Sequence, residues 1–302
     1  MKNLLEPPTG IVNAVLDTDT YNEIDDQYAL AYFLLSKEKI NPLAVYAAPF
    51  SNVRAETPAE GMEKSYEEIL RVLPLCGREG FPAYRGSTTY LPDEYTPVES
   101  EAARDLVKRA LEHSPENPLY VLTIGAITNV ASALLMVPAI RKNIVVVWLG
   151  GQAHSWPILS WAEFNMVQDI AAARVVFNSG CALVQMPCMG TVSHLTTTGP
   201  ELREHMKGKS PLGNYLYEIT CDKAVNEDGG GETWSRVIWD ISVVAWLMGE
   251  EFVKAYTTPA PVPSYDNGYL HSADRHAMKV AFYLNRDAIF LDLFKKLRNA
   301  LT

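Results

Sequence analysis

The sequence predicts an α/β fold in which an open, mostly parallel sheet carries helices on both faces. Short apolar runs rich in β-branched residues alternate with longer segments whose apolar residues recur at helical spacing. This alternation continues to about residue 190 and is typical of β–α units that build parallel sheets. The 302-residue chain is 48% hydrophobic, which is enough material for the core of such a fold.

The predicted elements follow one another in a regular order. Strands are expected where apolar runs end at turn residues, over 11–16, 42–48, 118–124, 143–150 and 181–187. Helices are expected where segments of helical period follow these runs, over 25–36, 58–73, 126–137 and 169–178. Together these elements predict a Rossmann-like sheet.

The alternation weakens after residue 190. The glycine-rich run 226–234 predicts a flexible loop that could act as a lid, and a helix is expected over 239–248. A second strand–helix run over 276–297 closes the chain. No linker-like tract interrupts the sequence, so we expect residues 1–302 to form one domain with a C-terminal elaboration.

Composition excludes several classes of protein. The formal charge of −10 argues against a nucleic-acid-binding surface. No apolar run approaches the roughly 18 residues that a membrane span needs. The start, MKNLLEPPTG, does not have the pattern of a signal peptide, so we expect a cytoplasmic protein. The four cysteines show no C-x-x-C spacing, which favours free thiols over disulfides or a zinc site.

The most unusual segment is the acidic run DTDTYNEIDD, residues 17–26, which directly follows the first predicted strand. It holds five carboxylates in ten positions and no lysine or arginine. Ligands of open α/β sheets bind outside the carboxyl ends of the strands, which is where this run lies. So many like charges repel one another unless a cation or protons neutralise them. Oxygen ligands without histidine or cysteine favour a hard cation, Ca²⁺ or Mg²⁺.

Other interpretations of the run explain less of it. Asp25 and Asp26 would complement a helix dipole, but Asp17 and Asp19 on the strand side would remain unexplained. An EF-hand register fails at Tyr21, and so does the D-x-D-x-[TV] pattern of haloacid-dehalogenase phosphatases. A cation site is therefore the favoured interpretation, with a phosphatase as a distant alternative.

Four segments match, in order, the motifs of one enzyme family. The acidic run is similar to D-x-D-P-G-x-D-D with a longer loop and no Pro-Gly, and TIGAITNVASAL (123–134) to G-P-L-T-N-x-A. LGG (149–151) and AEFNMVQDIAAARVVF (162–177) resemble G-G…A-E-F-N-x-x-x-D, and IWDISVVAWL (238–247) resembles H-D-P-x-A-V-A. The chain thus resembles the inosine/uridine-preferring nucleoside hydrolase superfamily. This resemblance implies a nucleoside-hydrolase-like fold, Ca²⁺ dependence and a homo-oligomer.

The resemblance also implies roles around the metal. In the family, water bound to Ca²⁺ attacks the anomeric carbon of a ribosyl group. Asp19 would be the general base and a metal ligand, and Asp26 and Asp240 would be further ligands. Ile124 lies where the family offers a backbone carbonyl to the metal, and Asp17 would orient the loop.

Substrate-binding residues follow from the same resemblance. Asp25 would accept a hydrogen bond from a ribose hydroxyl, and Asn52 would bind the sugar. Glu163 and Asn165 match residues that hold the ribose hydroxyls. Trp239 could stack on a base or a sugar face.

The chain departs from the family at the leaving-group side. The H-D pair is Trp239-Asp240 here, and that histidine is thought to help protonate the leaving base in purine-cleaving members. An indole cannot do so, which makes an ordinary purine nucleoside a poor substrate unless His154, His276 or a tyrosine substitutes. Pro157 also lies where the family often has a sugar-binding asparagine.

The sequence therefore predicts a Ca²⁺-dependent hydrolase that cleaves the N-glycosidic bond of a ribonucleoside or related riboside. One alternative is a hydrolase of another pentoside. Another is a metal-dependent sugar- or nucleoside-binding protein that has lost catalysis. Two polar residues in the motifs are expected to be structural, Asn129 as a hydrogen-bonding residue and Asp169 as a helix N-cap.

Overall fold

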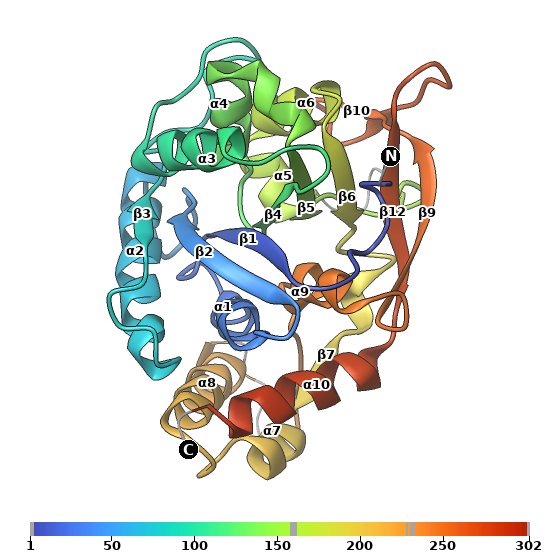
Figure 1. Ribbon diagram of the computed structural model, residues 1–302. Helices are drawn as coiled ribbons and strands as arrows, with labels where there is room; N and C mark the ends of the chain where they lie inside the picture. The colour runs from blue at the N-terminus through green and yellow to red at the C-terminus, as the bar shows by residue number, and fades with distance from the viewer. Residues whose placement is uncertain (1–2, 158–161, 228, 230–232, 301–302) are drawn as a thin grey trace.

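The computed structural model describes residues 3–157, 162–227, 229 and 233–300, and an eight-stranded sheet forms its centre (Figure 1). The strand order is β3-β2-β1-β4-β5-β6-β12-β9, and all neighbouring strands are parallel except β12 and β9. The predicted open, mostly parallel sheet is confirmed. Its strands are β1 (Val12–Thr18), β2 (Ile40–Ala47), β3 (Ala83–Arg85), β4 (Leu119–Thr123), β5 (Ile144–Leu149), β6 (Ala182–Met186), β9 (Val253–Pro259) and β12 (Ala277–Leu284).

Helices cover both faces of this sheet, as predicted (Figure 1). One face carries α3 (Glu101–Leu111), α4 (Thr128–Met136) and α6 (Ile170–Asn178), which share one hydrophobic core. The other face carries α1 (Asp26–Leu35), α2 (Pro58–Leu75), α8 (Pro211–Asp222), α9 (Ile241–Met248) and α10 (Arg286–Arg298), which share a second core.

Shorter elements connect these layers. They comprise two small antiparallel ladders, β7 (Thr196–Thr198) with β8 (Ser235–Val237) and β10 (Val262–Pro263) with β11 (Tyr269–Leu270). The short helices are α5 (Phe164–Gln168), α7 (Gly199–His205), the 3₁₀ turns η1 (Pro138–Lys142) and η2 (Val192–His194), and the π-helical turn η3 (Lys223–Glu227).

The apolar character of the central elements explains their position. Every residue of β5, IVVVWL, is buried, as expected for a parallel strand covered on both faces. Nine of the ten residues of α1 are buried, because this helix packs against α2, α9 and α10 as well as the sheet. The N-terminus of α1, with its two aspartates, therefore begins inside the protein.

Several elements differ from the sequence prediction. Helices α3, α7 and α8 and the antiparallel strand β9 fall in segments where no element was expected. In the predicted loop 226–234, residues 226–227 belong to η3, while 228 and 230–232 lie outside the described residues, so a lid there remains a prediction. Among the helices that are described, none is both long enough and apolar enough to cross a bilayer.

Strand β1 lies between β2 on one side and β4 on the other. The chain continues from β1 to β2 and later returns to add β4 at the opposite edge of β1. Ligands in open α/β sheets bind at such a reversal of strand order, beyond the carboxyl ends of the strands. The acidic run begins at this end of β1.

Candidate functional site

A cavity of about 380 Å³ lies where β1, β4 and β5 end. The acidic run, the end of β4 and the segments that follow β5 and β8 all contribute to its wall. All nine residues predicted to bind metal or substrate line it: Asp19, Asp25, Asp26, Asn52, Ile124, Glu163, Asn165, Trp239 and Asp240. The fold thus brings together residues spread over more than 200 positions of the sequence.

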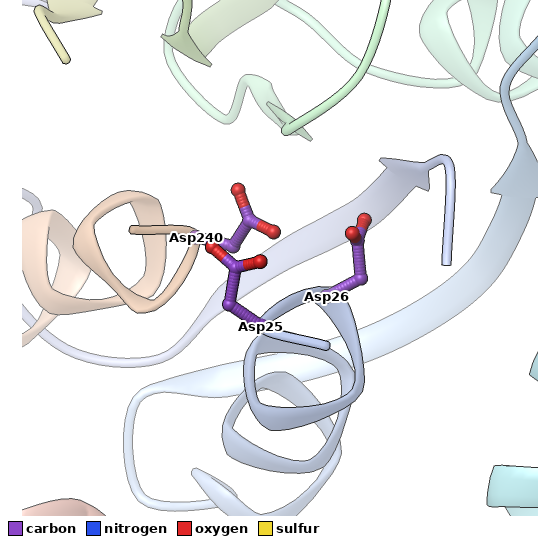
Figure 2. Close-up of side chains that lie close together, drawn as sticks. All are labelled: Asp25, Asp26 and Asp240. Atoms are coloured by element: carbon purple, nitrogen blue, oxygen red, sulfur yellow. The ribbon is translucent and has the colours of Figure 1, made fainter. Parts of the chain in front are cut away.

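Three carboxylates converge in this cavity, as Figure 2 shows. Asp25 and Asp26 come from the start of α1, and Asp240 precedes α9. Each offers a carboxylate oxygen, and these three atoms lie within 4.8 Å of one another. All three residues are buried. Asp25 was predicted to bind substrate, but the structure groups it with Asp26 and Asp240, two of the four predicted metal ligands.

The acids at the start of α1 do not act as simple helix caps. Asp25 occupies the N-cap position, yet its side chain makes no capping hydrogen bond. Its Oδ2 instead accepts a 2.9 Å hydrogen bond from the backbone N–H of Trp239. Asp26 Oδ1 accepts a 2.6 Å bond from Thr18 Oγ1 at the end of β1. These contacts turn both carboxylates toward the cavity rather than toward the helix backbone.

Asp19 is 1% exposed, and neither of its carboxyl oxygens has a hydrogen-bond partner among the described residues. An unpartnered buried carboxylate is costly, so it indicates a ligand that the protein chain does not supply. The carboxylate lies close to the backbone at Gly125, where an added Cβ would be 2.9 Å from Oδ1. Any side chain at position 125 would therefore crowd the Asp19 carboxylate.

Burial and mutual repulsion raise the pKa values of these acids. Burial is the main cause at each site, and it raises the pKa of Asp25 to about 7 and that of Asp26 to about 6. The pKa values of Asp19 and Asp240 lie well above the usual range, because neighbouring carboxylates add to the effect of burial. Protons or a cation must therefore balance the charge. An all-oxygen donor set of this kind fits a hard divalent cation.

The predicted ribose-binding residues are also held in place. Glu163 is the N-cap of α5, and its carboxylate accepts hydrogen bonds from the N–H groups of Gly151, Asn165 and Met166. The Asn165 side chain donates to the carbonyl of Ile124 at 2.8 Å and to that of Leu149 at 2.9 Å. Asn165 thereby ties the ends of β4 and β5 together at the cavity wall.

Asn52, Asn129 and Asp169 take part in hydrogen bonds that shape the site. Asn52 donates to Asn22 Oδ1 at 2.6 Å and so contacts the loop of the acidic run. Asn129 donates to Asp17 Oδ1 at 2.8 Å, and both side chains are fully buried. The side chain of Asp169 caps α6. The structural roles expected for Asn129 and Asp169 are confirmed.

The structure also adds residues that the sequence did not single out. Arg236, Gln152, Cys188 and Met189 line the main cavity. Two residues considered as substitutes for the absent histidine lie elsewhere. His154 lines a neighbouring cavity of about 230 Å³, and His276 lines neither of these two cavities. No motif position covers Arg236, so no sequence pattern marked it as a residue of the cavity.

Comparison with known proteins agrees with the geometry. The profile of the family described as inosine-uridine preferring nucleoside hydrolase matches residues 14–290. Pyrimidine-specific ribonucleoside hydrolase RihA of Citrobacter koseri is 29% identical over 234 residues, 68% of this chain and 73% of that protein. Non-specific ribonucleoside hydrolase RihC of Salmonella typhimurium is 29% identical over 264 residues, 80% of each chain.

Solved structures share the fold. A plant nucleoside hydrolase, PpNRh1, superposes with a TM-score of 0.76 at 20% identity, over 95% of this chain and 99% of that one. A purine-preferring ribonucleoside hydrolase from Gardnerella vaginalis gives a TM-score of 0.76 at 18% identity, over 95% and 98%. With the profile covering most of its length, the chain belongs to the inosine-uridine preferring nucleoside hydrolase family and is an enzyme of the glycosidase class.

Proposed function

We propose that this protein hydrolyses the N-glycosidic bond of a ribonucleoside or related riboside with the help of a bound Ca²⁺ ion. The observation that carries this proposal is the Asp19 carboxylate, buried without a partner among the described residues in the cavity where Asp25, Asp26 and Asp240 cluster. A metal-dependent binding protein would also keep Asp19 as a ligand, so the match to a hydrolase family is what favours catalysis over binding alone.

Different residues would bind the cation, take the proton from water and hold the ribose. Asp26 and Asp240, with Asp19 and the Ile124 carbonyl, would hold the cation, which when bound supplies charge that acidifies water and orients sugar hydroxyls. Asp19 would take the proton from the attacking water. Asp25, Asn52, Glu163 and Asn165 would hold the ribose, and Trp239 offers a flat face for the sugar or the leaving group.

The names of the relatives do not indicate which nucleobase this protein would release. Their names describe pyrimidine-specific, non-specific and purine-preferring enzymes. Trp239 stands where the family has a histidine that helps to protonate the leaving base. The second candidate substrate is therefore a riboside with another leaving group, or another pentoside. The expected homo-oligomer and cytoplasmic location also remain predictions.

Substitution of one carboxylate tests the proposal. We expect Asp26→Asn to lower Ca²⁺ affinity at least about 10²-fold, since even residues behind metal ligands are worth about 10–100-fold. Release of free base from a panel of ribonucleosides should fall with it. Titration calorimetry measures the affinity, and chromatography measures the base.

Asp287→Asn is the matched control, because Asp287 lies on α10 with its side chain 82% exposed. It should keep both Ca²⁺ affinity and rate. An Asp26→Asn protein with unchanged affinity and unchanged base release would refute the proposed site.

A further inference from the structure

Arg236 places a permanent positive charge in the wall of an otherwise acidic cavity. It belongs to β8, three residues before Trp239, and lines the cavity together with Glu23 and Trp239. Its side chain is 21% exposed. Burial raises the pKa of Asp25, and the positive charge of Arg236 lowers it in part. Asp25 Oδ2 also accepts a hydrogen bond from the backbone N–H of Trp239. Arg236 therefore lines the same cavity as Trp239, which stands where the family has its histidine.

An ion pair fixes the position of this guanidinium. Arg236 Nη2 lies 2.5 Å from Glu23 Oε2, and Glu23 also lies 3.7 Å from Lys223 Nζ. Glu23 comes from the loop 20–24, which is longer than the corresponding loop of the family motif. The enlarged loop and β8 thus meet at one edge of the cavity, held by opposite charges.

A guanidinium and an imidazole help a leaving group in different ways. Arginine stays protonated at any pH where a protein works, so it does not act as a general acid. It can instead stabilise negative charge through several N–H donors in a fixed planar arrangement. Such a donor in a partly buried site is typically worth about 10²–10³ in rate when charge develops on the group that it contacts.

We propose that Arg236 stabilises the leaving group as an anion, and that the preferred substrate is a riboside whose aglycone departs as an oxygen-bearing anion. A pyrimidine base, with a carbonyl next to the glycosidic nitrogen, has this chemistry. The bond from the anomeric carbon to the aglycone breaks, and its electron pair stays with the aglycone beside the guanidinium. Water forms the new bond to the anomeric carbon, Asp19 takes its proton, and the aglycone later takes a proton from solvent.

This inference rests on the proposed function and is tested with leaving groups of graded acidity on one sugar. The substrates are p-nitrophenyl β-D-ribofuranoside, phenyl β-D-ribofuranoside and uridine, each with Ca²⁺ present. Arg236→Gln should lower kcat/KM about 10²-fold or more for phenyl riboside and uridine. The loss for the p-nitrophenyl riboside should stay below about 10-fold, because p-nitrophenolate needs little stabilisation.

Two further variants separate charge stabilisation from loss of structure. Arg236→Lys keeps the charge but not the planar donors, and should fall between wild type and Arg236→Gln. Arg85→Gln, a matched control that removes an exposed ion pair with Glu63, should leave all three rates unchanged. Thermal unfolding of each variant checks that it is folded.

The outcomes are distinct. Losses that grow as the leaving group becomes less acidic support the inference. Equal losses on all three substrates, or no loss, would overturn it while leaving the proposed function intact. A wild-type protein that cleaves none of the three would overturn the proposed function, and the inference with it.

Discussion

At the residue level, the buried Asp19 carboxylate indicates that the site binds a ligand that the protein chain does not supply. Its neighbours in the acidic run have partners: Asp26 accepts from Thr18, and Asp25 accepts from the backbone of Trp239. Asp19 has none among the described residues, although it is fully buried. A buried carboxylate without a donor is rare in folded proteins, because desolvation is then uncompensated. Asp19 therefore marks the position where water and a cation would complete the site.

The raised pKa values predict how the cation-free protein depends on pH. Asp25, with a pKa of about 7, and Asp26, at about 6, lie above the ordinary value of 3.8 because of burial. The folded protein then binds more protons than the unfolded chain in this range, so its stability falls as pH rises from about 4 to about 7. Ca²⁺ competes with these protons and should stabilise most above that range.

Thermal unfolding with chelator and with excess Ca²⁺, at about pH 5 and about pH 8, measures this dependence. We expect the melting temperature in chelator to be lower at the higher pH, and the increase caused by Ca²⁺ to be larger there. A melting temperature in chelator that rises between these two pH values would contradict the assignment.

At the scale of elements, one buried side chain joins the strands that form the site. Asn129, in α4, donates to Asp17 in β1 and to the Ala47 carbonyl at the end of β2. Its Oδ1 accepts from the backbone N–H of Ser87 at 2.8 Å. The carboxyl end of β1, from which the acidic run begins, thus depends on a helix more than 100 residues later.

Removing this side chain should destabilise the fold. Asn129→Ala leaves Asp17 and the Ser87 N–H with fewer partners in a buried place, which costs about 2–5 kcal/mol of the free energy of unfolding. Chemical denaturation measures the change. Asn299→Ala, at the exposed end of α10, serves as control and should stay within about 0.5 kcal/mol. Equal effects of the two substitutions would contradict this role.

The elements also show what the sequence could and could not predict. Strand β5 and helix α1 were predictable because their apolar residues are continuous, and burial on all sides requires that. Helix α3 was missed although its sequence carries helix signals: Ser100 caps it, and its buried residues, mostly alanines, recur at helical spacing. Strand β9 pairs antiparallel with β12, a tertiary contact that local periodicity does not contain.

The residues of the candidate site were also only partly predictable from the sequence. Residues such as Asp26 and Asn165 were identified by motifs with fixed spacing, and the structure places them in one cavity. Arg236 was not identified, because its partner Glu23 is 213 residues away and Arg236 itself lies outside the matched motif segments. A contact between two inserted or variable segments becomes visible only once the chain has folded.

The architecture of the whole molecule explains why the candidate site lies at the carboxyl ends of the strands. Strand β1 lies between β2 and β4, and the reversal of strand order opens a crevice at their carboxyl ends. Helices α1 and α9 pack against each other on one face of the sheet. Their N-terminal ends bring Asp25, Asp26 and Asp240 together at this crevice (Figure 2). Sheet topology and helix packing together create this acidic pocket.

The proposed function requires that this pocket binds a cation and that the bound cation is needed to cleave a riboside. Release of p-nitrophenol from p-nitrophenyl β-D-ribofuranoside, measured with Ca²⁺ and with excess chelator, tests both requirements together. This leaving group needs little protonation, so Trp239 in place of histidine should not prevent the reaction. We predict release with Ca²⁺ that chelator abolishes and added Ca²⁺ restores. No release from protein that demonstrably binds Ca²⁺ would overturn the proposed function.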